Sequence, residues 1–116
     1  KFMRRIFHYI YVSMSRPQRV WDCLKNLCMD LRYSGRYLGT PIQNGSADYR
    51  NTTSSEYDVI ESLFSKVEVT PSDIIVDVGC GKGRVLNWCL RRLKNNSIIG
   101  IEADQAVARK TAESFK

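Results

Sequence analysis

A glycine-rich turn between two apolar segments constrains the fold of this 116-residue chain more than any other feature. Ile74–Val78 is a short, mostly β-branched run, and the turn residues 79–83, Gly-Cys-Gly-Lys-Gly, follow it directly. A near-continuous apolar strand is typical of a parallel sheet that is buried on both faces. Glycines at alternate positions allow a sharp turn, let a ligand approach the backbone, and let the next helix pack closely on the sheet. We therefore expect a buried strand that runs into a helix whose free N–H groups face a crevice.

Hydrophobic periodicity predicts that helices and strands alternate in the second half of the chain. The pattern indicates a helix over about 83–93, a strand over 97–102, and a last helix that Asp104 can cap. A leading helix precedes the first strand, and this order predicts a βαβ unit with a parallel sheet and a right-handed crossover. The apolar stripes expected for the three helices are Ile60, Leu63, Phe64 and Val67, then Val85, Leu86, Cys89 and Leu93, then Val107, Thr111 and Phe115.

The leading helix should start at Ser54 or Ser55. Ser55 is followed three residues later by Asp58, which resembles a capping box with Asp in place of the favoured Glu. Tyr57 lies at the start of this helix, and core packing is at least as good an explanation for it as a place over a ligand.

Two well-known nucleotide-binding loops do not match the turn. A dinucleotide fingerprint needs a third glycine where Arg84 stands, and a P-loop needs wider spacing and a Ser or Thr where Gly83 stands. The turn alone is also compatible with a purely structural connection from strand to helix. Lys82 and Arg84 are expected to be solvated charges at the start of the helix. The helix dipole slightly disfavours positive charge there, which leaves an anionic neighbour as the alternative.

The pattern Asp77-x-Gly79-x-Gly81-x-Gly83 resembles motif I of the class I S-adenosylmethionine-dependent methyltransferases, especially their bacterial members. A looser likeness extends to Dot1-type lysine methyltransferases. The resemblance covers about residues 55–116. It implies an α/β fold, the N-terminal part of a Rossmann-like parallel sheet with its first two strands, preceded by a helical extension. It also implies S-adenosylmethionine as the cofactor and methyl transfer as the activity.

The resemblance assigns roles to individual residues. Glu102 ends the second strand, 19 residues beyond Gly83, where family members hold the ribose of the cofactor through both hydroxyls. Asp77 would organise the turn or reach the amino group of the cofactor, and Cys80 would be a small filler whose backbone matters. Taken alone, an acidic residue such as Glu102 is more often a solvated strand end. The cofactor-binding residues expected in this way are Asp77, Gly79, Cys80, Gly81, Gly83, Glu102 and Ala103.

A complete domain of this family has about seven strands, and the chain supplies two. We therefore expect the chain to be an incomplete methyltransferase domain, inactive by itself, in which no residue can be named as catalytic and the methyl acceptor is unknown. The first strand would have an open side, and an apolar strand with an open edge favours self-association.

Composition divides the chain into a basic, aromatic front and a charge-balanced remainder. Residues 1–50 carry nine basic and three acidic residues and eight of the twelve aromatic residues, whereas residues 51–116 carry nine of each charge. A helix is expected over about 17–31, followed by a long loop. The front could dock on nucleic acid or an acidic membrane surface. Packing of the helix on the core is favoured, because Val20, Trp21, Leu24, Leu27, Cys28 and Leu31 form an apolar stripe.

Cysteine spacing argues against a metal site. There are four cysteines and one histidine, His8, and no C-x-x-C pair, so structural zinc is not expected. Free thiols in a reducing cytosol are favoured over disulfides, which predicts a cytoplasmic protein. No apolar run is long enough to span a membrane.

Overall fold

The computed structural model describes residues 17–39 and 54–115. Most of the long loop expected after the first helix lies outside these residues. The described elements are α2 (Pro17–Ser34), α3 (Tyr57–Phe64), β1 (Ile74–Val78), α4 (Arg84–Arg92), β2 (Ser97–Ile101) and α5 (Gln105–Ser114).

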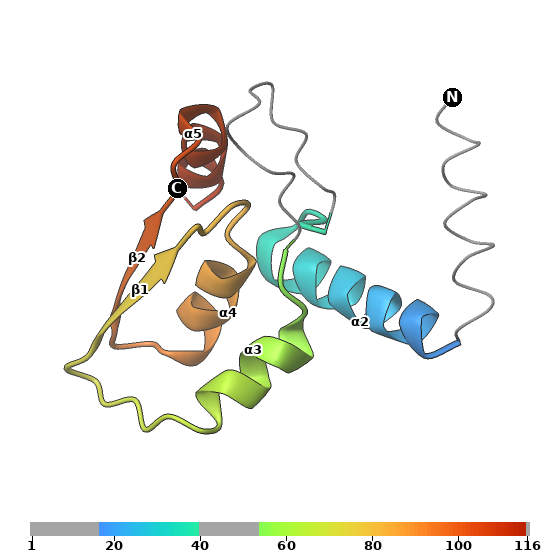
Figure 1. Cartoon of the computed structure of the whole chain (residues 1–116), viewed down its shortest axis with the longest axis horizontal. Helices are drawn as coiled ribbons and strands as arrows, with labels where there is room; N and C mark the ends of the chain where they lie inside the picture. The colour runs from blue at the N-terminus through green and yellow to red at the C-terminus, as the bar shows by residue number, and fades with distance from the viewer. Residues whose placement is uncertain (1–16, 40–53, 116) are drawn as a thin grey trace.

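The two strands form the expected parallel βαβ unit. β1 pairs with β2 in parallel from Ile74 opposite Ser97 to Val78 opposite Ile101, and α4 is the crossover between them. Figure 1 shows α4 beside the strands, with α2 and α3 both next to α4 on its side away from the strands. The α/β class and the parallel βαβ unit of a Rossmann-like sheet are therefore confirmed.

A small aromatic and aliphatic core lies between the helices and one face of the sheet. Its fully enclosed part consists of Tyr57, Ile60, Trp88 and Cys89. The ring of Phe64 stacks on that of Trp88 with 4.5 Å between the ring centroids. Because α3 and α4 both contribute aromatic residues, the helix ahead of the first strand is part of the core that supports the sheet.

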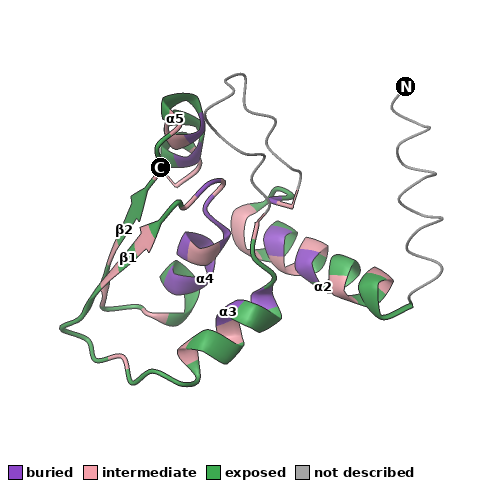
Figure 2. Ribbon diagram, viewed as in Figure 1, coloured by how far each residue is buried: buried purple, intermediate pink, exposed green. Residues whose placement is uncertain are grey.

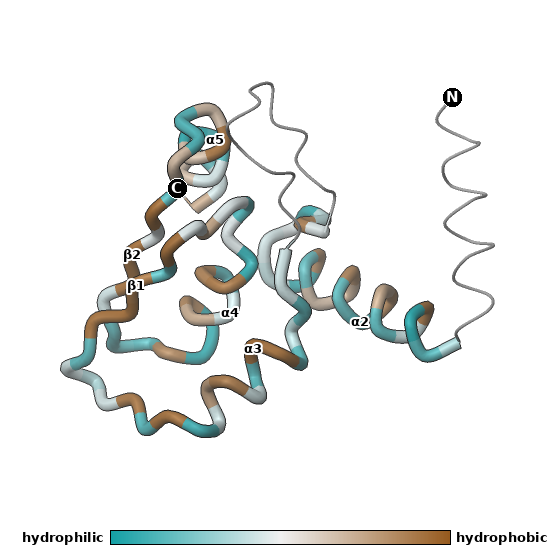
Figure 3. The backbone as a smooth tube through the Cα atoms, viewed as in Figure 1, coloured by the Kyte–Doolittle hydropathy of each residue, from teal (hydrophilic) through white to brown (hydrophobic). Residues whose placement is uncertain are grey.

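The opposite face of the sheet is apolar and uncovered, so the expectation of a strand buried on both faces is wrong for the described part of the chain. Val76 and Val78 are 50% and 78% exposed, and Ile99 and Ile101 on β2 are 47% and 50% exposed. The strands are among the most hydrophobic segments in Figure 3, yet they are largely exposed in Figure 2. The reason is that the described helices pack on one face only.

The expected capping box of α3 is not formed. The N-cap is Glu56, which makes no side-chain cap hydrogen bond, and Ser54 Oγ instead donates to Leu38 O at 2.5 Å. The amide of Tyr57 donates to Asn26 Oδ1 on α2 at 3.0 Å. A tertiary contact thus caps this helix, which a local pattern cannot reveal. The cap expected for α5 is confirmed, since Asp104 Oδ1 accepts from the amides of residues 106 and 107.

The helix expected over 17–31 is present, but it packs through a different face from the one expected. Trp21, Leu24 and Leu31 of the apolar stripe are 66%, 48% and 50% exposed. The buried residues of α2 are instead polar, Asn26 and Asp30. This face packs inward because its polar groups find buried partners on α3 and α4.

Candidate functional site

The glycine turn lies where β1 ends and α4 begins. Gly79, Gly81 and Gly83 have φ angles of 80°, 51° and 83°, a region that side chains with a Cβ rarely adopt. A Cβ on Gly79 would meet no atom within 4 Å, and one on Gly81 would meet only a carbonyl oxygen at 4.0 Å. These two glycines therefore leave open space along the backbone at the carboxyl end of the sheet.

Most amides of the turn have partners within the chain, whereas the free N–H groups expected from the sequence belong to the start of the helix, and that expectation stays a prediction. The amides of Gly79 and Cys80 both donate to Ile101 O, at 2.7 Å and 3.0 Å, and that of Gly83 donates to Cys80 O at 2.8 Å. The end of β2 closes directly against the turn and takes up these donors. These three amides are therefore not available to an anionic phosphate group, which binds through free backbone N–H groups.

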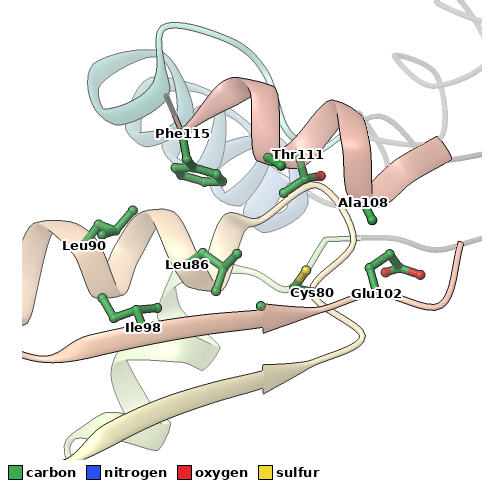
Figure 4. Close-up of a pocket in the computed structure, with 10 residues that line it drawn as sticks. Cys80, Leu86, Leu90, Ile98, Glu102, Ala108, Thr111 and Phe115 are labelled. Carbon is green, nitrogen blue, oxygen red and sulfur yellow. The ribbon is translucent and has the colours of Figure 1, made fainter. Parts of the chain in front are cut away.

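Glu102 lies against the turn, as expected. Its Oε2 accepts from the Gly81 amide at 2.8 Å and its Oε1 accepts from the Asp104 amide at 3.0 Å. The carboxylate is partly buried, and Figure 4 shows it at the same end of β2 as Cys80. Each carboxylate oxygen has a second lone pair, so a carboxylate fixed by two amides can still accept two hydrogen bonds from a ligand.

Asp77 supplies a second carboxylate at the same end of the sheet. Its Oδ2 is buried and has no hydrogen-bond partner within the described chain. Burial raises the pKa of this carboxyl, and the negative charge of Glu102 raises the pKa further. A buried polar atom without a partner normally has an explanation, and a bound ligand that donates a proton or carries positive charge is one.

Helix α5 braces the turn from the other side. Thr111 Oγ1 donates to Gly81 O at 2.6 Å. A Cβ on Gly83 would lie 2.6 Å from the Phe115 ring and 3.1 Å from Thr111. The expectation that Gly83 lets the helix pack on the sheet is therefore wrong, because its missing side chain makes room for α5.

Gly100 provides the close packing that was assigned to Gly83. A Cβ on Gly100 would lie 2.6 Å from Leu86 of α4 and 2.9 Å from Cys80 Sγ. This residue was missed, although an isolated glycine inside a strand is a signal for close backbone approach. Cys80 fills the space above it, and burial raises the pKa of the thiol, as do the charges of Asp77 and Glu102. Its expected role as a filler fits a thiol that stays protonated.

The two charged residues of the turn are not simply solvated. Arg84 is 4% exposed and forms a buried ion pair with Asp30 of α2, so the expectation of a solvated charge is wrong for this residue and the alternative of an anionic neighbour holds. Lys82 is partly buried, and burial lowers its pKa, as does the nearby charge of Arg36. The structure thus brings together Asp77, the turn and Glu102, while Ala103 is exposed in the connection to α5.

A largely apolar hollow of about 320 Å³ lies beside the turn, between α4, β2 and α5. Leu86, Ile98 and Phe115 form much of its lining, and Cys80 and Glu102 form the end nearest the turn (Figure 4). The Glu102 carboxylate therefore stands at the edge of a space that a small apolar group could enter.

The remaining described residues add no other centre of this kind. Within 17–39 and 54–115, no three His, Cys, Asp or Glu side chains gather as a metal site would require. The same ranges contain no helix with the length and apolar character needed to cross a membrane. The four cysteines are free thiols.

Comparison with known proteins gives one distant similarity. Over 67 residues, 58% of this chain, the sequence is 22% identical to a protein of Invertebrate iridescent virus 6 named "Putative methyltransferase 235L". The relationship is methyltransferase-like. The matched part spans about a quarter of the length of that viral protein, 25%. No protein-family model matches the chain, and no solved structure matches it.

Proposed function

We propose that this chain is the cofactor-binding part of an S-adenosylmethionine-dependent methyltransferase. The observation that carries the proposal is the Glu102 carboxylate, which is fixed against the glycine turn beside the unpartnered oxygen of Asp77. The distant similarity to the viral protein supports methyltransferase activity in general.

The charges at the turn favour this cofactor over a nucleotide with a pyrophosphate. Two carboxylates meet there, and the amides of Gly79, Cys80, Gly81 and Gly83 already donate within the chain. An anion would meet the negative charge of both carboxylates there and would find no free donor among these four amides. S-adenosylmethionine carries a positive sulfonium and a positive ammonium group next to a ribose with two hydroxyls, which suits a pair of carboxylate acceptors.

The two carboxylates and the glycines of the turn would each contact a different part of the cofactor. Glu102 would accept the ribose hydroxyls through the lone pairs that its two amide partners leave free. The free oxygen of Asp77 would accept the ammonium group, and Gly79 and Gly81 would let the ligand lie against the backbone. When bound, the cofactor supplies an electrophilic methyl group. Positioning of an acceptor in line with that group is the remaining requirement, and the acceptor is open.

Calorimetry with S-adenosylhomocysteine tests the proposal. Glu102→Gln keeps the shape but removes the charge, and we expect it to weaken binding by about 10- to 100-fold, since hydrogen bonds to charged groups contribute roughly 1.5–3 kcal/mol. Glu61→Gln is the matched control, because Glu61 is an exposed carboxylate paired with Arg92 away from the turn. Equal affinity of Glu102→Gln and the wild-type protein would refute the proposed role.

A basic binding module, in which the βαβ unit is only structural, is the alternative function. Its prediction is salt-sensitive binding to RNA or to anionic vesicles without any effect of S-adenosylmethionine. Competition by S-adenosylhomocysteine but not by NAD would exclude a different nucleotide enzyme.

A further inference from the structure

A buried carboxylate on α2 collects donors from three separate parts of the chain. Asp30 is 0% exposed. Its Oδ2 accepts from the Leu38 amide at 2.9 Å, and its Oδ1 accepts from Tyr57 Oη at 2.8 Å and from Arg84 Nε at 2.9 Å. Arg84 Nη2 donates to Oδ2 as well. Asp30 therefore joins α2 to the segment after it, to the start of α3 and to the start of α4.

Arg84 is fixed on several sides. It is the first residue of α4 and follows Gly83 directly. Besides its two bonds to Asp30, its Nη1 donates to Ser55 O at 3.1 Å, and its guanidinium lies 5.4 Å from the centre of the Tyr57 ring. A planar guanidinium held in this way allows little movement of the backbone that carries it.

Tyr57 extends the network to both neighbouring helices. Its hydroxyl donates to Asp30 and accepts from Asn87 Nδ2 at 3.0 Å, while its amide donates to Asn26. Burial raises the pKa of this phenol well above its usual value, so it remains a donor at any physiological pH. Every member of the network has a partner, which is the condition under which a buried polar cluster fixes one geometry.

We infer that Asp30 and Arg84 are positioning residues for the glycine turn, so that α2 sets the geometry of the cofactor site. This inference rests on the proposed function. Arg84 ends the turn, and Gly81 and Gly83 lie three and one residues before it. A buried ion pair is weak evidence for stability, because apolar replacement of both partners is often neutral. What this pair contributes is a fixed direction for the backbone between β1 and α4.

The test uses Asp30→Asn combined with Arg84→Met. The double variant leaves no buried charge unpaired. Its amide oxygen at position 30 can still accept from the Leu38 amide, while its NH2 group faces the Tyr57 hydroxyl oxygen, so we expect it to fold with a modestly lower melting temperature. We expect its affinity for S-adenosylhomocysteine to fall about tenfold, within the range typical of coupling between sites. In the ligand-free protein, hydrogen exchange of the Gly81 amide should become about tenfold faster, because its bond to Glu102 requires the present geometry of the turn.

Two further variants complete the design. Arg84→Lys keeps the charge but loses the planar fork, and we expect values between the wild-type and the double variant, which covers the case in which the double variant does not fold. Arg92→Met is the matched control. Arg92 lies on α4, as Arg84 does, and its exposed ion pair is with Glu61 of α3, so we expect no change in affinity or in hydrogen exchange.

Wild-type exchange and wild-type affinity in a folded double variant would overturn the inference, and so would faster exchange with unchanged affinity. If the wild-type protein binds no S-adenosylhomocysteine, the proposed function fails. Hydrogen exchange of the Gly81 amide in the ligand-free protein would then still show whether Asp30 and Arg84 hold the geometry of the turn.

Discussion

Replacing Asp77 by Asn should make the ligand-free protein more stable and its cofactor site weaker. Asp77 Oδ2 is buried without a partner, and a buried polar atom in that state costs roughly 1–3 kcal/mol. Asp77 is only partly buried, so the low end applies, and we expect the free energy of unfolding to rise by about 1 kcal/mol. For a domain of this size this corresponds to roughly 4–8 °C in melting temperature.

The rise in the free energy of unfolding caused by Asp77→Asn should depend on pH in a defined direction. Burial and the charge of Glu102 raise the pKa of Asp77 in the folded protein above its unfolded value. Stability linked to the protonated carboxyl is therefore fully present below the unfolded value, near pH 4, and is lost as the pH rises through the raised value. The difference between Asp77→Asn and wild type should be small in acid and reach its full size at neutral pH.

Urea unfolding followed by tryptophan fluorescence, at neutral pH and near pH 4, measures this difference. Calorimetry with S-adenosylhomocysteine measures the second half of the prediction, a loss of affinity of roughly tenfold for the lost charge-assisted bond. Asp73→Asn is the control, since this exposed carboxylate already accepts from the Thr70 amide at 2.7 Å. An Asp77→Asn protein that is less stable than wild type at neutral pH would show that the unpartnered carboxylate does not destabilise the fold, and the reasoning would fail.

Three other substitutions and one thiol reaction test separate features. Gly83→Ala should destabilise the fold by about 2–3 kcal/mol in thermal unfolding, because the backbone there is left-handed and the added Cβ would lie 2.6 Å from the Phe115 ring. Gly79→Ala shares the left-handed backbone but has open space around it, so it should cost only about 1–2 kcal/mol. Val76→Lys on the uncovered face of the sheet should reduce self-association in light scattering, and an unchanged particle size would contradict this. Cys89 should resist a thiol reagent in the native state, because it is 0% exposed and burial raises its pKa to about 11.

The sequence predicted the elements that local patterns control. The helix expected over 83–93 is Arg84–Arg92, and the strand expected over 97–102 is Ser97–Ile101. These segments combine strong periodicity with clear turn residues at both ends. The position of Glu102 was predictable as well, because parallel strands that end together bring their following residues to one edge.

The buried pair of Asp30 and Arg84 could not be predicted, because 54 residues separate its members and each resembles a solvated helix residue. The error on α2 has a related cause. Periodicity shows that Trp21, Leu24 and Leu31 share a face, but it does not show which face a tertiary partner will cover. Polar residues that become buried only through each other leave no local signal.

The hydrogen bonds of Gly81 connect the turn to chain that is made much later. Its amide and carbonyl are held by residues 21 and 30 positions farther along, Glu102 and Thr111. During synthesis on the ribosome, the turn can therefore acquire its final shape only after β2 and α5 have emerged. Translation that pauses before Thr111 should leave a nascent chain whose first strand and crossover helix are complete but whose binding loop is still unformed.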